Sequence, residues 1–300
     1  MNRLIALGQK IYRPWVGREF RRMIVFYCRV LLHKQQMNQL IDFFEQDNFK
    51  RELANINPFF FEQVTRQFFY KSSTFVERQK IVSEHVSYIV NNLNKTTIRS
   101  IYSIDGWKIW SEQFESKELS LVVFFHGGQR KEGLLSLVLK ISDCEIYQMI
   151  FWIANDPENN QPVIWLGAMQ GSNHPDALNI IKSLTKYFHG YRTKNLILYM
   201  LRCFAQSLGI EQIYAVSNEG FYANNHLRID RKLKTSLDDF WLESGGSVCK
   251  DRRFYKLPVE EYRKSMDEIK THKRNLYRKR FVKMDEVADV ISIAVANKVI

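Results

Sequence analysis

The chain has 300 residues, a formal net charge of +12, 45% hydrophobic residues, and only 13 glycines and 6 prolines. This composition indicates a globular protein and excludes collagen-like, low-complexity and disordered chains. A chain of this length buries roughly three quarters of its unfolded surface, so it needs no disulfide or metal to fold. No apolar run approaches the ~20 residues of a membrane-spanning helix. Arginines interrupt the apolar segment near the N-terminus, so we expect no secretion signal.

The four cysteines are far apart in the sequence, at Cys28, Cys144, Cys203 and Cys249. No two of them have the spacing of a zinc knuckle or a CxxC redox site. We therefore expect reduced thiols, a cytoplasmic location and no metal site.

Positive charge is concentrated at the two ends of the chain. Residues 1–34 carry a net charge of +7 and residues 250–283 a net charge of +8, whereas residues 35–249 sum to −1. Such ends suit an anionic membrane surface or a nucleic acid. Because the basic C-terminal stretch occurs together with a basic amphipathic N-terminus, the membrane is favoured over nucleic acid. The third interpretation is that both basic stretches are solvated helix faces.

The first hundred residues have the apolar spacing of helices. We expect helices over residues 15–47, 58–70 and 74–94. Short β-rich runs separated by turn residues then predict an antiparallel meander. The four expected strands are Leu119–His126, Leu134–Ile141, Glu145–Ala154 and Pro162–Gln170.

Helices and strands alternate in the last part of the chain. The expected order is a helix over Pro175–Phe188, a helix over Thr193–Leu208, a strand over Ile210–Val216, a short helix over Asp238–Ser244, and a hairpin of Ser247–Cys249 with Phe254–Leu257. Residues 260–297 are expected to form a basic helix and then a more apolar one. The sequence thus predicts an α+β protein with three parts: a basic helical N-terminal region (1–110), a mixed, mostly antiparallel sheet with helices (111–258), and a basic helical C-terminal tail (259–300).

The predicted order of strands and helices resembles the GNAT acyltransferase fold. Residues 192–218 are similar to the stretch that runs from a phosphate-binding turn through a helix into a strand, and residues 240–257 resemble the late helix, turn and hairpin. This resemblance implies that Arg192, Lys194 and Asn195 bind the phosphate of an acyl-CoA or of an acyl carrier protein thioester. Asn195 and Ile197 stand where GNAT proteins have small residues, so the resemblance does not extend to a standard CoA cradle.

A second resemblance covers nearly the whole chain. The sequence is similar to the VirK/YbjX family of Gram-negative bacteria in Trp165–Gly167, Gln170-Gly171, Tyr187–Leu208, Ala215–Asn218, Asp238–Trp241 and Gly245-Gly246. The resemblance implies a place at the inner face of the envelope and links to antimicrobial peptide resistance and virulence.

Two further places offer candidate catalytic groups. His126 ends an apolar strand before Gly127-Gly128, where it is either a base lining a cleft or the polar cap of a turn. Ser217 and Asn218 follow a strand, at the sheet edge where sites form, and either position an acceptor or form a turn.

The leading hypothesis is an acyl-type transferase that modifies an envelope lipid or glycan, attached peripherally to the cytoplasmic face of the inner membrane. A non-catalytic envelope factor that keeps the fold is the first alternative. A basic RNA-binding regulator is the second.

Overall fold

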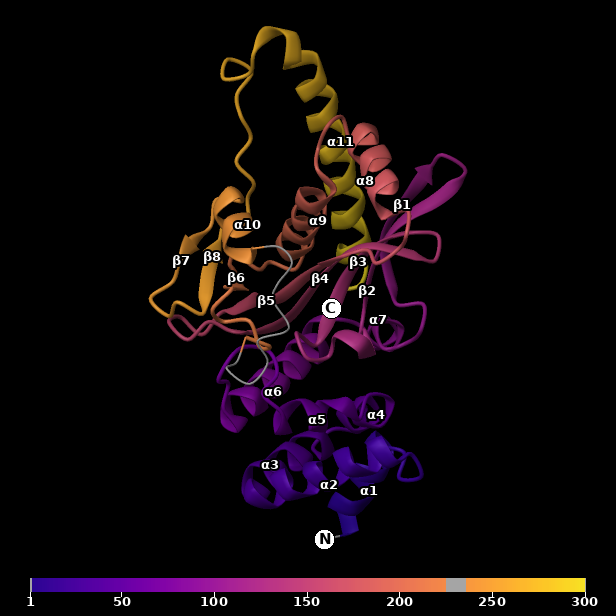
Figure 1. The fold of residues 1–300 in the computed structure, drawn as a ribbon, viewed down its shortest axis with the longest axis vertical. Helices are drawn as coiled ribbons and strands as arrows, with labels where there is room; N and C mark the ends of the chain where they lie inside the picture. Colours follow the sequence, from indigo (N-terminus) through magenta and orange to yellow (C-terminus); the bar gives the residue numbers. More distant parts are fainter. Residues whose placement is uncertain (1, 225–235, 300) are drawn as a thin grey trace.

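A single sheet lies between two layers of helices (Figure 1). The structure is a computed structural model that describes residues 2–224 and 236–299. The N-terminal helices pack below the sheet, and the last long helix lies against its other face. One continuous hydrophobic core contains residues from all three parts, from Leu4 to Val295. The predicted α+β class is confirmed.

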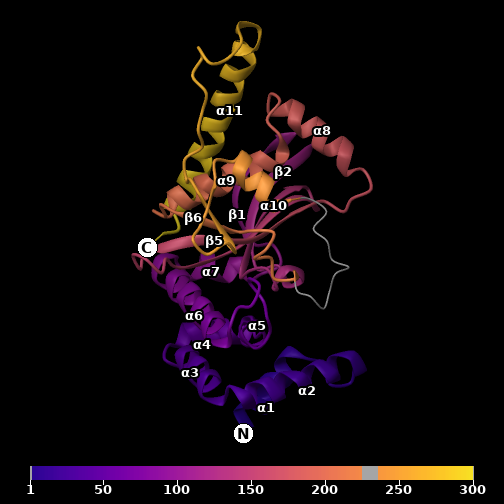
Figure 2. The ribbon, with the colours of Figure 1, turned by 60° about the vertical axis from the view of Figure 1, so that its left-hand side comes forward.

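The N-terminal layer consists of short helices that precede the sheet. They are α1 (Asn2–Ile11), α2 (Gly17–Leu32), α3 (Lys34–Glu45), α4 (Asn48–Ile56), α5 (Phe59–Thr65), α6 (Phe75–Asn92) and α7 (Lys95–Ile101). A capping box between Thr74 and Glu77 fixes the start of α6, which crosses the face of the sheet at β4. Figure 2 shows α1 and α2 at the end of the molecule farthest from the sheet.

The described residues give one mixed sheet in the order β1-β2-β3-β4-β5-β6-β8-β7. Its strands are β1 (Trp107–Phe114), β2 (Lys117–Phe124), β3 (Leu135–Ile141), β4 (Cys144–Asn155), β5 (Pro162–Gly171), β6 (Ile213–Val216), β7 (Ser247–Val248) and β8 (Phe254–Leu257). Neighbours are antiparallel except β5 and β6, which are parallel and joined by a helical crossover.

The remaining helices cover the other face and the ends of the sheet. They are α8 (Ala177–Tyr187), α9 (Thr193–Ser207), α10 (Leu237–Glu243) and α11 (Thr271–Ala296), with a single 3-10 turn, η1 (Gly127–Gln129), after β2. Nearly the whole of α9 is buried, and α11 packs along it and against β1. None of the helices in the described ranges combines the length and the apolar character needed to cross a membrane.

A bulge in β5 shapes the face of the sheet that carries the N-terminal helices. Ile150 pairs with Ala168 but Phe151 pairs with Leu166, so Gly167 is the extra residue. A Cβ at position 167 would overlap the backbone of Glu132, whose carbonyl carbon would lie only 2.8 Å away. The loop between β2 and β3 therefore crosses the sheet at this bulge, and only glycine allows the close approach.

Several predicted boundaries were wrong. Residues 15–47 form two helices that meet at His33, and the helix expected over 58–70 is reduced to the seven residues of α5. The predicted two-part tail is one helix that begins at Thr271, so residues 260–270 are not helical. Strand β1 was not predicted from the sequence.

Candidate functional site

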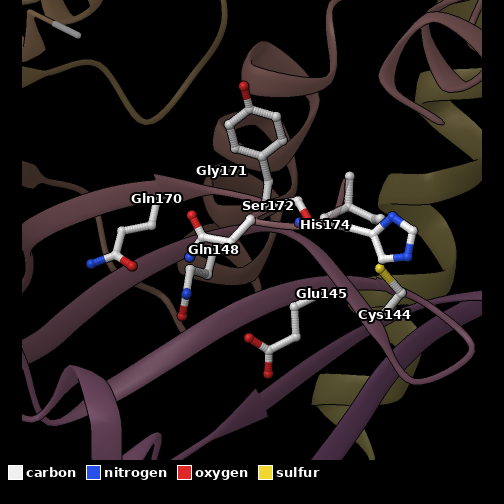
Figure 3. Close-up of a pocket in the computed structure, with 10 residues that line it drawn as sticks. Cys144, Glu145, Gln148, Gln170, Gly171, Ser172 and His174 are labelled. Carbon is white, nitrogen blue, oxygen red and sulfur yellow. The ribbon is translucent and has the colours of Figure 1, made fainter. Parts of the chain in front are cut away.

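A polar pocket of about 290 Å³ lies where β4 begins and β5 ends (Figure 3). Its lining comes from Cys144–Gln148 on β4 and from Gln170–His174 on β5 and the loop that follows. Antiparallel pairing of these strands places Gln148 opposite Gln170. In Figure 3 the side chains of Glu145, Gln148 and Gln170 project to the same side of the sheet.

His126 lies beside this pocket and contacts its carboxylate. Nε2 of His126 lies 3.6 Å from Oε2 of Glu145, while Nδ1 accepts a hydrogen bond of 3.2 Å from the backbone N–H of Gly128. Since Nδ1 is the acceptor, the proton of the neutral ring is assigned to Nε2, which points to Glu145. The interaction with His126, which outweighs the effect of burial, lowers the pKa of Glu145. Glu145 is therefore ionised at neutral pH.

Within the described ranges, the pocket contains one unpaired hydrogen-bond acceptor besides the Glu145 carboxylate. Oε1 of Gln148 is buried and has no hydrogen-bond partner among the described residues. The amides of Gln170 and Gln129 bond each other reciprocally at 2.9 and 3.0 Å. Together with the Glu145 carboxylate, the free amide oxygen suits a ligand that donates hydrogen bonds, such as an amine or a hydroxyl compound.

Ser217 and Asn218 are not in this pocket, and both have structural hydrogen bonds. The Ser217 hydroxyl is buried, donates to the carbonyl of Arg252 at 2.8 Å and accepts from the N–H of Gly220 at 2.9 Å. The Asn218 side chain accepts from the N–H of Leu237 at 2.8 Å and so anchors the start of α10. These contacts connect β6 to its neighbours and leave neither side chain facing the pocket.

The residues predicted to bind a donor phosphate lie at the start of α9. Arg192 precedes the first turn and is exposed, and its side chain makes no ion pair or hydrogen bond with any residue the structure describes. Lys194 instead pairs with Glu243 at 3.1 Å and lies over the ring of Phe240. The structure thus leaves Arg192 available for a ligand and gives Lys194 a partner on α10.

Asn195 lines a second, larger cavity of about 770 Å³ between α9 and residues 258–264. Oδ1 of Asn195 and Nε of Arg202 are both buried there without hydrogen-bond partners in the described part of the chain. The guanidinium of Arg202 donates to the carbonyl of Ser244 at 2.8 Å. Burial lowers the pKa of Arg202, and nearby Glu261 opposes this effect.

The comparison with known proteins identifies the family. A family model described as "Protein of unknown function (DUF535)" matches residues 16–292. The chain belongs to this family. It is 36% identical over 126 residues to the Escherichia coli protein named "Uncharacterized protein YbjX", an alignment that covers 41% of this chain and 38% of that protein. The predicted membership of the VirK/YbjX family is confirmed.

Two Haemophilus influenzae proteins, both named "Uncharacterized protein", resemble this DUF535 chain along most of its length. One is 22% identical over 92% of this chain and 91% of its own length. The other is 25% identical over 89% of this chain and 86% of its own length. No solved structure matches.

Sequence reasoning placed His126 at a strand end but missed the residues that it faces. Glu145 and Gln148 belong to β4, Gln170 belongs to β5, and His174 reaches the pocket from the loop after β5. They form no motif in the sequence because strand pairing, not spacing, brings them together. The strand alternation of β4 does place Gln148 on the face opposite the buried Met149, which was the available signal.

Proposed function

We propose that this DUF535 chain is an acyl-type transferase whose acceptor binds in the polar pocket at the end of β5. The observation that carries the proposal is the ionised Glu145, held beside His126 at the edge of a pocket in which Oε1 of Gln148 has no described hydrogen-bond partner. A carboxylate in this position can orient the amine or hydroxyl group of an acceptor and take its proton. His126 acts through Glu145 and is a positioning residue.

The donor is proposed to lie where β5 and β6 separate. These parallel strands share only three residue pairs, which end at Leu166 and Ala215, and β5 continues to Gly171. The N-terminus of α9 favours an anion, and the side chain of Arg192 beside it has no described partner. An acyl-CoA or an acyl carrier protein thioester, each of which has a phosphate next to its acyl arm, fits this arrangement.

The proposed reaction combines an acceptor in the polar pocket with a donor held at the start of α9. The acceptor's oxygen or nitrogen attacks the thioester carbonyl carbon and forms the new acyl bond, while Glu145 takes the proton that the acceptor loses. The carbon–sulfur bond then breaks, and the departing thiolate receives that proton. No oxidant, metal or further reactant is required.

The acceptor is proposed to be an envelope lipid or glycan, reached from the cytoplasmic face of the inner membrane. Helix α2 exposes apolar side chains, among them Phe20, Ile24 and Leu31, on a surface that also carries the exposed Arg18 and Arg21. Apolar residues interleaved with arginines are typical of helices that bind the surface of an anionic bilayer. This surface supports peripheral attachment through the N-terminal layer.

Ligand-induced thermal stabilisation tests the proposal. CoA, a long-chain acyl-CoA and acyl carrier protein thioesters are added to the purified protein, and the unfolding midpoint is measured for the wild type, Glu145→Gln and the exposed control Glu211→Gln. We expect an acyl thioester to stabilise all three proteins, because Glu145 contacts the acceptor rather than the donor. If no thioester stabilises the wild type, the transferase is rejected in favour of a non-catalytic envelope factor.

A further inference from the structure

A third pocket, of about 240 Å³, lies under α6 on the face of the sheet that the N-terminal helices cover. Four of its aromatic rings form a closed circuit of contacts. Ring centroids are 6.4 Å apart for Tyr70 and Trp152, 6.2 Å for Trp152 and Trp165, 5.0 Å for Trp165 and Phe254, and 5.1 Å for Phe254 and Tyr70. These four side chains are called the aromatic box below. They come from a loop and three different strands, so the fold itself assembles the box.

Carboxylates surround the aromatic box. Glu77 and Glu84 reach it from α6, and Asp251 reaches it from the turn before β8. Lys80 and Arg253 are the cations of the lining, so the five charges leave one net negative charge in a protein whose total is +12. The Lys80 side chain is largely exposed, and its Nζ lies 3.6 Å from Oε1 of Glu84. The local charge thus has the opposite sign to the whole molecule.

Arg253 shows that these rings accept a positive charge. Its guanidinium lies 4.8 Å from the centroid of Tyr70 and 5.8 Å from that of Phe254, and Asp251 binds it at 2.7 Å. Trp152 and Trp165 have no such cation in the part of the chain that the structure describes. The indole N–H of Trp165 is buried there and also lacks a hydrogen-bond partner.

We propose that the aromatic box binds a small organic cation with an alkylated ammonium group. Aromatic faces attract such cations through the quadrupole of the ring, and tryptophan is the strongest of the rings. The cavity is smaller than the roughly 300–1,000 Å³ of sites for drug-sized ligands, so the ligand is a small headgroup. The unpaired indole N–H would bind an oxygen of the same ligand.

This box is separate from the transferase pocket. Gln148 and Trp152 lie four residues apart on the same face of β4. The loop between β2 and β3 crosses the sheet between them, where Gly133 lies against Ile150. Within that loop, the N–H of Leu134 bonds the carbonyl of Phe151 at 2.9 Å. The proposed cation site therefore does not depend on the proposed acyl transfer.

The test compares choline with its neutral isostere 3,3-dimethyl-1-butanol, using calorimetry and tryptophan fluorescence. We expect choline to bind at least ten-fold more tightly than the isostere and to change the fluorescence of the wild type. Trp165→Leu should abolish binding, whereas the control Trp15→Leu, at an exposed site, should not. Equal binding of the two compounds, or no binding of choline to the wild type at 50 mM, would overturn the proposal.

Glu77→Gln keeps the test decisive if Trp165→Leu does not fold. Glutamine can still close the capping box at the start of α6, so this variant removes charge and retains the helix. We expect choline affinity to fall about three- to ten-fold in Glu77→Gln and to be unchanged in the exposed control Glu211→Gln. Unchanged choline affinity in Glu77→Gln would contradict the role of the carboxylates.

Discussion

The N-terminal helices are joined to the sheet by a buried carboxylate, and its removal should destabilise the protein strongly. The side chain of Glu62 on α5 has no exposed surface, and it accepts hydrogen bonds from Tyr12 at 3.0 Å, Arg66 at 3.1 Å and Arg130 at 2.7 Å. Arg130 belongs to the loop that crosses the sheet, so one carboxylate connects three separate parts of the chain. Glu62→Gln keeps the shape of the side chain but leaves two arginines without their counter-charge.

The expected loss follows from the burial of the partners. Removing one member of a buried ion pair costs about 3–5 kcal/mol. Because the side chains of Arg130 and Arg66 are 20% and 31% exposed, water can solvate them in part, and we expect the lower end of that range. For a protein of 300 residues the unfolding entropy is about 0.6 kcal/mol/K, so a loss of about 3 kcal/mol lowers the unfolding midpoint by roughly 5 °C.

The same group predicts a pH dependence. Burial alone would raise the pKa of Glu62, but Arg130, Arg66 and Tyr12 lower it below the usual value. Since the folded-state pKa is below the unfolded value of about 4.3, this stabilisation is complete above the unfolded pKa and is lost as the pH falls through the folded pKa. The difference between wild type and Glu62→Gln should therefore be largest at neutral pH and shrink below about pH 4.

Scanning calorimetry at pH 7 and in steps down to pH 3 measures both effects. The control is Glu52→Gln, which breaks an ion pair with Arg99 whose two side chains are 38% and 50% exposed, and which should leave the midpoint almost unchanged. A Glu62→Gln midpoint equal to the wild type at pH 7 would refute the reasoning, as would a difference that persists unchanged at pH 3.

Three other predictions follow from the fold and the proposed sites. Gly167→Ala should lower the free energy of unfolding by about 1–3 kcal/mol, because the new Cβ overlaps the backbone of Glu132 and the loop must move. Thermal unfolding measures this loss, and an unchanged unfolding midpoint would contradict the close approach at the bulge. Arg192→Ala should weaken thioester binding, measured by titration calorimetry, by about 10- to 100-fold and leave the unfolding midpoint unchanged. A lower unfolding midpoint with unchanged thioester affinity would show that Arg192 has a structural role instead. Anionic vesicles should co-sediment the protein at low salt and release it at high salt, and Arg21→Ser should weaken this; equal recovery on neutral vesicles, or preference for single-stranded RNA, would contradict membrane attachment.

The sequence predicted the central strands well because their apolar alternation and turn residues agree. The four strands expected between residues 119 and 170 match β2 to β5 within two residues at each end. Strand β1 was missed because its pairing with β2 shifts between Lys108 and Trp110, which puts the buried Ile109 and Trp110 side by side and breaks the alternation. The break at His33 has no proline or glycine to signal it, so two helices looked like one.

The candidate pocket was less predictable than the fold. His126 could be singled out because two glycines follow an apolar strand, but its partner Glu145 is 19 positions later and is reached only through the register of β3 and β4. Ser217 and Asn218 attracted attention by their place after a strand, yet their polar atoms bond the backbone of neighbouring segments. Local spacing cannot distinguish such a structural bond from an open site.

Turnover is the most direct test of the transferase. Purified protein is incubated with a radiolabelled acyl thioester and an isolated envelope fraction, and transfer of label to lipid or glycan is followed for the wild type, Glu145→Gln and Glu211→Gln. We expect transfer by the wild type and by Glu211→Gln, and at least a 100-fold slower rate for Glu145→Gln, since general base catalysis contributes typically 10²–10⁴-fold. Equal rates for Glu145→Gln and the wild type, or no transfer by the wild type, would contradict the proposed acyl transfer.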